Sequence, residues 1–314
     1  MRHPLLWALV LAPAAAASVY TVHSLFKYTR MISNIFLGLK YNPVHEVLPA
    51  TAGERVSILD TGGHEIEAVL VDKKGASNLV IFCHDSGSTK ESWEKYAYFF
   101  PGLGYKVLSV DFVSAAGDPE KNPLSQWPSQ EDTEKLVLVV RWARRAFGEN
   151  VPIVLFGVSK GADIALAASY SGLPVSGVIT DGLFSMREIF RDYIRKWAPI
   201  LVKPNLFGEN YPSWVVNTFT DLGFWYCQKQ SKKKFVDVEK LLKREHVPLL
   251  MIHGESDDYI PPTHQQFLHR LDRRRKESKK LIVPKAGHNE AVMLDRDTYE
   301  KTVVQFLKKV VPIP

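Results

Sequence analysis

Residues 151–169 are VPIVLFGVSKGADIALAAS: an apolar run, two glycines around Ser159, and a stretch of small helix-forming residues. This order predicts a strand, a tight turn and a helix, with the serine at the turn. Gly157 and Gly161 leave room for the turn, and the helix directs its positive N-terminal end at negative charge developing beside the serine. A serine hydroxyl becomes a nucleophile when it is presented in this way and loses its proton. The surrounding strand and helix favour a nucleophilic Ser159 over a chance match.

Two further polar residues follow predicted strands, an acid first and a histidine second. Residues 247–252 predict a buried strand that leads into HGESDDYIP at 253–261, with carboxylates at Asp257 and Asp258. A later apolar strand ends in PKAGH, which places His288 on a loop. Taken singly, the aspartate could cap a turn and the histidine could be a surface residue. Serine, acid and histidine in this chain order, each directly after a strand, instead favour a catalytic triad.

The rest of the chain alternates predicted strands and helices, which is typical of an α/β domain with a mostly parallel sheet. Helix 130–147 carries a capping pair, Ser129 and Asp132. Loops at the carboxyl ends of the strands are the usual place for a site in such a sheet, and all three triad candidates fall there. The eight predicted strands are 55–60, 64–72, 78–84, 105–111, 151–156, 175–181, 247–253 and 280–284, and the helices are 90–101, 130–147, 160–171, 262–276 and 295–310.

Three motifs carry a resemblance to a known family: GVSKG at 157–161, HGESDDYIP at 253–261 and AGH at 286–288. With them, residues 50–310 resemble the α/β hydrolase superfamily, most closely the small membrane-associated hydrolases grouped with serine aminopeptidase-like and Bem46-like proteins. The resemblance implies an α/β-hydrolase fold, with helices on both faces of the sheet and a helical lid insertion.

The resemblance also assigns roles within the site. It implies Ser159 as the nucleophile, His288 as the base and Asp257 as the triad acid, because the family's acid stands four residues after the histidine of the HG pair. Asp258 is the neighbouring alternative. Asp181, which follows the sixth predicted strand, is a second alternative, because some family members place the acid there.

The oxyanion hole is where the sequence departs from the family pattern. The resemblance implies two backbone donors, the amide of Lys160 and, from the loop after the third strand, the amide of Ser86. That strand usually ends in His-Gly but here ends in His84 and Asp85. A carboxylate beside an oxyanion opposes its charge unless it turns away or pairs with a cation, and Lys160 is one candidate. Asp85 could equally begin the turn before the next helix.

Residues 183–246 interrupt the alternation of strands and helices at the position where related hydrolases insert a lid. Aromatic side chains in the insertion could line a pocket for an apolar acyl group, or fill the core of an ordinary helical subdomain. Two basic clusters, at 232–234 and at 273–280, could contact anionic headgroups or a coenzyme A ester, although such runs are usually solvated helix ends. The expected domains are an α/β hydrolase domain over 53–314 and the lid within it.

The N-terminal residues 1–30 predict a single-pass membrane anchor or a signal segment. Residues 4–26 lack a charged side chain and reach the length of about 20 apolar residues that spans a bilayer. Small residues at 14–18 offer a cleavage point, which would make the protein secreted or periplasmic. An uncleaved anchor is favoured because the apolar run continues past this point. Residues 31–52 are expected to connect it to the hydrolase domain.

Composition narrows the function classes. The 314 residues carry a formal charge of +6 spread along the chain, without zinc spacing or a helix-turn-helix pattern, so nucleic acid is not an expected partner. The ten histidines are scattered, and no glycine-rich phosphate loop occurs, so neither a metal nor a cofactor is expected. Cys83 and Cys227 are too few for a disulfide framework.

Together the sequence predicts a membrane-anchored serine hydrolase of the esterase, lipase or thioesterase type, acting on a carboxylic ester or thioester of a small, apolar acyl compound. An acyl-CoA thioesterase or acyltransferase is the alternative, because the Ser-Lys-Gly-Ala run at 159–162 resembles the nucleophile turn of that family. Peptidase activity stays open, since the fold does not fix the leaving group. A third hypothesis, a non-catalytic hydrolase-like binding module, draws its support from Asp85.

Overall fold

The structure is a computed structural model. It describes residues 4–38, 53–60, 62–112, 123–203, 205, 207–244, 247–272 and 277–311, with the side chains of residues 4–10 left out. The described residues divide into two compact units. One, called here the sheet domain, comprises the described residues within 40–186 and 233–314, and the other, called the helical unit, those within 1–39 and 187–232.

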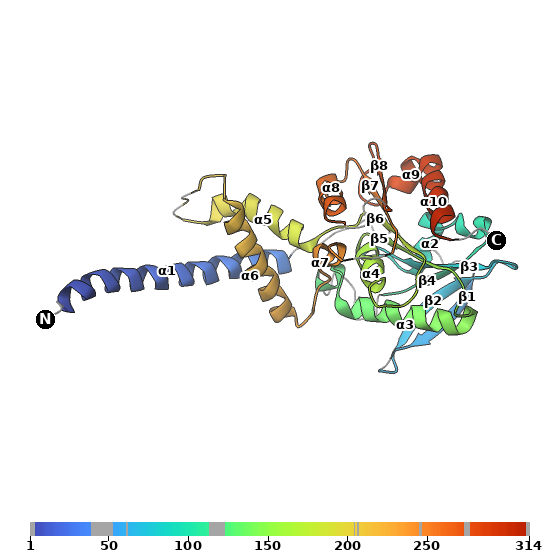
Figure 1. The fold of residues 1–314 in the computed structure, drawn as a ribbon, viewed down its shortest axis with the longest axis horizontal. Helices are drawn as coiled ribbons and strands as arrows, with labels where there is room; N and C mark the ends of the chain where they lie inside the picture. The colour runs from blue at the N-terminus through green and yellow to red at the C-terminus, as the bar shows by residue number, and fades with distance from the viewer. Residues whose placement is uncertain are drawn as a thin grey trace. The chain divides into compact units, whose positions relative to one another are not determined.

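The sheet domain is built on an eight-stranded sheet, as the sequence predicts (Figure 1). The strands lie in the order β1-β2-β4-β3-β5-β6-β7-β8, and all neighbours are parallel except that β2 is antiparallel to both β1 and β4. The central strands are buried along their whole length and rich in Val, Ile, Leu and Phe, as strands covered on both faces require. Their bounds are β1 Glu54–Leu59, β2 Glu65–Val71, β3 Asn78–Cys83, β4 Tyr105–Val110, β5 Ile153–Val158, β6 Gly177–Asp181, β7 Leu249–Gly254 and β8 Lys279–Val283.

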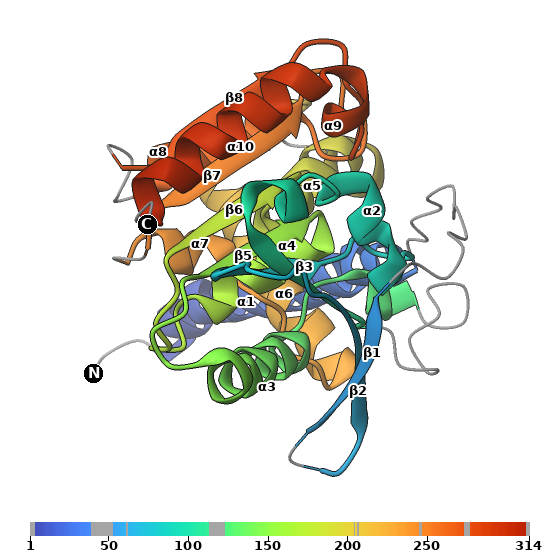
Figure 2. The ribbon, with the colours of Figure 1, turned by 90° about the vertical axis from the view of Figure 1, so that its right-hand side faces the viewer.

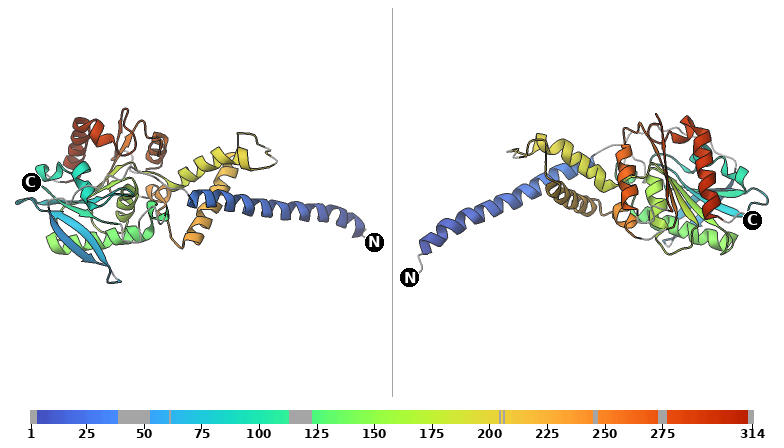
Figure 3. Two further views of the ribbon diagram at one scale, coloured as in Figure 1. Left: turned by 180° about the vertical axis from the view of Figure 1, so that it is seen from behind. Right: turned by 45° about the horizontal axis from the view of Figure 1, so that its top comes forward.

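Helices cover both faces of this sheet (Figure 2). On one face the core includes Leu136 of α3 and Leu268 of α8, and on the other it includes Tyr96 of α2 and Tyr299 of α10. Figure 3 shows the same two layers from two further directions, with α3 and α10 on opposite sides. The helical segments are η1 Lys90–Ser92, α2 Trp93–Tyr96, η2 Phe100–Leu103, η3 Pro123–Gln126, α3 Gln130–Phe147, α4 Lys160–Ala168, α7 Val238–Leu242, α8 Pro262–Leu271, α9 Ala291–Leu294 and α10 Arg296–Val310.

The predicted capping pair at the start of α3 is present. The Ser129 hydroxyl accepts from the Asp132 amide at 3.2 Å, and the Asp132 carboxylate accepts from the Ser129 amide at 3.1 Å. This reciprocal box satisfies two amides that a helix N-terminus otherwise leaves without partners. It also fixes where α3 begins, beside the loop that receives Lys160.

The helical unit contains α1 Pro4–Leu37, α5 Met186–Leu201 and α6 Ser213–Ser231 (Figure 1). Phe36 of α1 is fully buried and stacks on Phe190 of α5, with ring centroids 4.0 Å apart. Phe190 in turn meets Phe224 of α6 edge-on at 6.3 Å. The end of the N-terminal segment therefore supplies core residues to the two helices of the insertion.

The N-terminal segment differs from its prediction in two ways. Helix α1 continues to Leu37, past the expected boundary at residue 30, and residues 39–52 of the expected connector lie outside the described residues. The membrane-spanning anchor expected over residues 4–26 is not supported, because in the described parts of the chain no helix combines the length and apolar character needed to cross a bilayer. Polar side chains recur in this part of α1, at Ser18, Thr21 and His23.

The end of the predicted insertion belongs to the sheet domain. Val238 and Leu242 of α7 pack into its core, and the buried hydroxyl of Ser185 donates to Oε1 of Glu239 at 2.6 Å. The packing of α7 follows from its two buried aliphatic side chains, one turn apart. A lid role for residues 183–246 stays a prediction.

Candidate active site

Ser159 occupies the turn between β5 and α4. Its backbone has φ 50° and ψ −116°, a conformation that side chains other than glycine rarely adopt. The Ser159 amide donates to the carbonyl of Asp181 at 2.7 Å, and the amide of Ala162 donates to the Ser159 carbonyl at 2.9 Å. These bonds hold the serine in its strained conformation, as is common at functional sites.

Gly157 and Gly161 are required by close contacts around this turn. A Cβ added to Gly157 would overlap the carbonyl of Gly161, and a Cβ added to Gly161 would overlap the carbonyl of Cys83. The first contact tightens the turn itself. The second brings the N-terminus of α4 against the end of β3, from which the predicted oxyanion loop leaves. The two glycines thus place Ser159 next to that loop.

His288 lies on the loop after β8 and reaches both other triad candidates. Its Nε2 is 3.1 Å from Oγ of Ser159, and its Nδ1 is 2.7 Å from Oδ2 of Asp257. The side chains of His288 and Asp257 are 5% and 1% exposed, so water hardly screens their interaction. A carboxylate only accepts hydrogen bonds, which assigns the proton to Nδ1 and leaves Nε2 as an acceptor for the serine hydroxyl.

The turn after β7 orients Asp257. Its Oδ1 accepts from the amides of Tyr259 and Ile260 at 3.0 and 2.8 Å, while Oδ2 faces His288. The buried ring of His253 lies beside it, with Nε2 donating to the Ile260 carbonyl at 2.6 Å. Burial lowers the pKa of His253, so its neutral ring is favoured and it adds no positive charge to the site. The three predicted triad residues thus form one hydrogen-bonded chain.

The two alternative acids take other positions. Asp258 has an exposed side chain, although it is the neighbour of Asp257. Asp181 is buried, and its Oδ2 accepts from the hydroxyl of Tyr299 at 3.1 Å. Burial raises the pKa of Asp181 to about 6. The geometry therefore favours Asp257 as the partner of His288.

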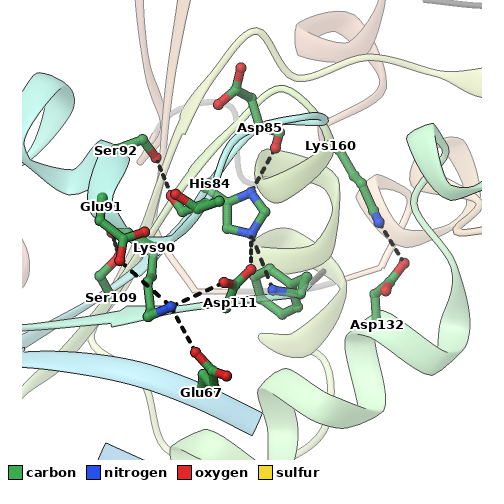
Figure 4. Close-up of polar contacts among 12 residues, drawn as sticks. Glu67, His84, Asp85, Lys90, Glu91, Ser92, Ser109, Asp111, Asp132 and Lys160 are labelled. Carbon is green, nitrogen blue, oxygen red and sulfur yellow. Dashed lines mark hydrogen bonds and ion pairs between the residues drawn. The ribbon is translucent and has the colours of Figure 1, made fainter. Parts of the chain in front are cut away.

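Of the possibilities that the sequence leaves open for Asp85, pairing with Lys160 is not the one found in the structure. The ammonium group of Lys160 lies 3.2 Å from Oδ2 of Asp132 and donates to the carbonyl of Ser125 at 2.8 Å (Figure 4). Asp85 instead accepts from Nδ2 of Asn289 at 3.3 Å. Lys160 is drawn to Asp132 because the capping box fixes that carboxylate at the start of α3.

The loop after β3 carries the predicted second oxyanion donor. Nδ1 of His84 donates to the carbonyl of Asp85 at 2.7 Å, which ties the loop to the end of the strand (Figure 4). Within the described residues the Ser86 amide donates to no other group. The amide of Lys160, the first residue of α4, has no acceptor inside its own helix. Both amides are therefore available as donors.

Two residues that sequence reasoning did not single out also lie at the site. Asn289 follows His288 directly and has φ 59°, a left-handed conformation that asparagine tolerates better than most residues. The ring of Tyr259 is 5.8 Å from that of His288, and its side chain is 57% exposed. Their only sequence signal is adjacency to the triad residues.

Comparison with known proteins agrees with this fold. The model of the alpha/beta hydrolase family matches residues 80–302, more than two thirds of the chain. The chain belongs to the alpha/beta hydrolase family. The predicted fold class and the resemblance noted in the sequence are thereby confirmed.

The relatives and solved structures that resemble this chain share low sequence identity with it. The protein is 26% identical to YqkD of Bacillus subtilis over 78% of this chain and 76% of the relative, and 24% identical to human ABHD12B over 91% and 73%. An esterase of Pyrococcus furiosus superposes with a TM-score of 0.61 at 20% identity, covering 87% of this chain and 99% of the esterase. The butyrate-bound esterase of Thermogutta terrifontis gives 0.60 at 14% identity, covering 83% and 96%. At these identities the structures show a shared fold, and membership of the family supports a hydrolase.

Proposed function

We propose that the protein is a serine hydrolase that cleaves a carboxylic ester or thioester through Ser159, His288 and Asp257. The observation that carries this proposal is the chain of two hydrogen bonds, 3.1 Å from the serine to the histidine and 2.7 Å from the histidine to the aspartate. At one end of this hydrogen-bonded chain a strained turn presents Ser159. At the other end two backbone amides hold the carboxylate of Asp257 in place. Each group thus has the partner that its role requires.

The reaction begins with proton transfer from Ser159 to Nε2 of His288 as the serine oxygen attacks the carbonyl carbon. The imidazolium that forms is stabilised by Asp257 through Nδ1. His288 then gives the same proton to the leaving alcohol or thiol, which departs and leaves an acyl-serine. Water, activated by His288 in the same way, attacks this ester and releases the acid.

Negative charge on the tetrahedral intermediate needs donors already in place. The amides of Lys160 and Ser86 are proposed to supply them, at the start of α4 and on the loop after β3. The positive end of α4 adds to this stabilisation. Losing one donor in such a hole typically lowers the rate by about 100- to 1,000-fold.

An apolar ester is the proposed substrate class. Three large apolar side chains near the triad loops in the chain are more than half exposed: Tyr259 on the loop that carries Asp257, and Met293 and Leu294 in α9, the helix that follows the loop of His288. Exposed apolar surface next to a site often contacts the ligand. The esterases of Pyrococcus furiosus and Thermogutta terrifontis that share this fold are consistent with a small ester.

Labelling with a fluorophosphonate probe tests the nucleophile without knowledge of the substrate. We expect the purified wild-type protein to be labelled and Ser159→Ala to lose labelling completely, because the probe reacts only with an activated serine. Ser171→Ala, at an exposed serine after α4, is the matched control and should label as the wild type does. Equal labelling of Ser159→Ala, or none of a folded wild type, would refute the proposal.

A non-catalytic binding module is the competing proposal, because Asp85 replaces the usual glycine of the oxyanion loop. The same labelling experiment separates the two, since a binding module needs no activated serine. A thioesterase acting on acyl-CoA is separated by comparing a long-chain acyl-CoA with a plain ester of the same acid. Of the basic residues that could contact coenzyme A, residues 273–276 lie outside the described residues.

A further inference from the structure

Asp85 is a buried carboxylate at the end of β3, where the family usually has glycine. Its side chain is 8% exposed, and its Oδ2 accepts from Nδ2 of Asn289 at 3.3 Å. Removing a carboxylate from water is costly unless hydrogen bonds compensate. The bond from Asn289 to Oδ2 compensates part of this cost, and it joins two segments that are 204 positions apart.

The partner of Asp85 lies directly against the reacting groups. A Cβ added at Gly182 would lie 3.2 Å from Oδ1 of Asn289, 3.6 Å from Cε1 of His288 and 3.8 Å from Cα of Ser159. These three atoms therefore surround one point. Asn289 is also the residue after His288, so a shift of its side chain would be transmitted to the base through one peptide unit.

Both ends of the contact are tied to the sheet domain. The Asp85 carbonyl accepts from Nδ1 of His84, whose Nε2 lies 3.1 Å from the Phe112 amide at the end of β4. At the other end, the Asn289 carbonyl accepts from the hydroxyl of Tyr96 in α2 at 3.3 Å. The Asp85–Asn289 bond thus closes a bridge between two restrained loops.

Chemistry fixes the direction of the bond. A carboxylate can only accept, so the amide of Asn289 must present its NH₂ group to Asp85 and its oxygen toward Gly182. A bond with an ionised acceptor is stronger than a neutral one. Asparagine at position 85 would keep an acceptor, whereas alanine would leave the buried NH₂ group without one.

We propose that Asp85 is a positioning residue: through Asn289 it holds the His288 loop in register with the loop that carries the Ser86 amide. This inference rests on the proposed serine hydrolase. In that reaction the base and the oxyanion donor must act on one tetrahedral centre, so their relative placement matters. Misplacement of a reacting group by about 1 Å can cost about 100-fold in rate.

The test compares kcat and KM for one chromogenic ester among Asp85→Ala, Asn289→Ala, the double variant and Asp85→Asn. We expect each alanine variant to lower kcat by about 10- to 100-fold with KM within about threefold, the loss of one charge-assisted bond. The double variant should be no slower than the slower single one, because both remove the same bond. Asp85→Asn should recover most of kcat. Asp297→Asn, at an exposed position of α10, is the control.

A second measurement keeps the inference testable if the ester is not turned over. The Nδ1 proton of His288 should give a low-field proton resonance, assigned by its loss in His288→Ala. Asp85→Ala should broaden or abolish it while Asp297→Asn preserves it. Absence of turnover and probe labelling in the wild type would refute the proposed hydrolase. The change of the His288 resonance in Asp85→Ala tests the positioning role of Asp85 without requiring turnover.

Three results would overturn the inference. The first is an unchanged kcat and His288 resonance in Asp85→Ala. The second is a double variant in which the two losses multiply, which would mean that the residues act independently. The third is a higher kcat in Asp85→Gly than in the wild type, which would mean that Asp85 impairs the oxyanion loop.

Discussion

Asp257 uses one carboxylate oxygen for His288 and the other for the amides of its own turn. Asp257→Asn keeps the shape but can offer an NH₂ group to the histidine, which favours the wrong ring tautomer. We expect kcat to fall by about four orders of magnitude. The exposed neighbour gives a matched control, and Asp258→Asn should stay within about twofold of the wild type on the same ester. A large loss of kcat in Asp258→Asn would instead indicate that Asp258 is the triad acid.

Asp181 should make folding stability depend on pH. Burial raises its pKa from the ordinary 3.8 to about 6, so between these values the unfolded chain has lost the proton that the folded protein keeps. Stability from this group therefore falls as pH rises through the window, by about 3 kcal/mol in total. Asp181→Asn removes the titration and keeps an acceptor for Tyr299.

Urea unfolding at about pH 4 and about pH 7 measures this effect. The stability of Asp181→Asn relative to the wild type should improve toward neutral pH by up to about 3 kcal/mol. Exposed Asp297→Asn should follow the wild type at both values. A relative stability of Asp181→Asn that does not change with pH would contradict the assignment.

At the residue scale, sequence was informative where spacing carries chemistry. Ser159, Asp257 and His288 could be proposed because each follows a strand in the chain order of the family. The partner of Lys160 could not be predicted from sequence, because Asp85 and Asp132 are both carboxylates and only the packing of α3 brings Asp132 close to Lys160. Asn289 was missed for the same reason: its role depends on a contact with a loop 204 positions away.

At the scale of elements, the turn between β5 and α4 depends on its glycines. Gly161→Ala would drive a methyl group into the carbonyl of Cys83, so either α4 or β3 must shift. We expect a loss of about 3 kcal/mol in the free energy of unfolding, measured with urea. Gly102→Ala is the control, because nothing lies within 4 Å of the added Cβ. Similar stabilities of the two variants would show that the contact is easily relieved.

Most elements of the sheet domain were predictable because their patterns are local. The strand at 78–83 and helix α3 at 130–147 lie within one residue of their predicted bounds, the latter through its capping box. The predicted helix over 90–101 is instead three short segments, interrupted before Pro101. The end of α1 was predicted too early, at Arg30. The helix continues through the apolar stretch Met31 to Leu37 and ends before Gly38, a residue that commonly follows a helix end.

At the scale of the whole molecule, the helical unit has a core of its own, separate from the packing of the sheet domain. Phe36 and Phe190 belong to the helical unit, whose helices come from both ends of a gap of about 150 residues in the sequence. From the sequence, these segments are predicted separately, as an anchor and a lid, because no local pattern indicates that they share a core. The sheet domain has its own two clusters around Leu155 and Phe156.

Because the two units have separate cores, a cavity made in one core should destabilise that unit and leave the other unchanged. Phe36→Ala should destabilise the helical unit by about 3–5 kcal/mol, as loss of a fully buried phenylalanine does, while Phe26→Ala on the same helix should have little effect because that side chain is 60% exposed. Hydrogen exchange measured by mass spectrometry should accelerate in α5 and α6 of Phe36→Ala and stay unchanged in β5 and β7. Faster exchange throughout the sheet would mean that the two cores unfold as one, and unchanged exchange in α6 would mean that Phe36 does not stabilise it.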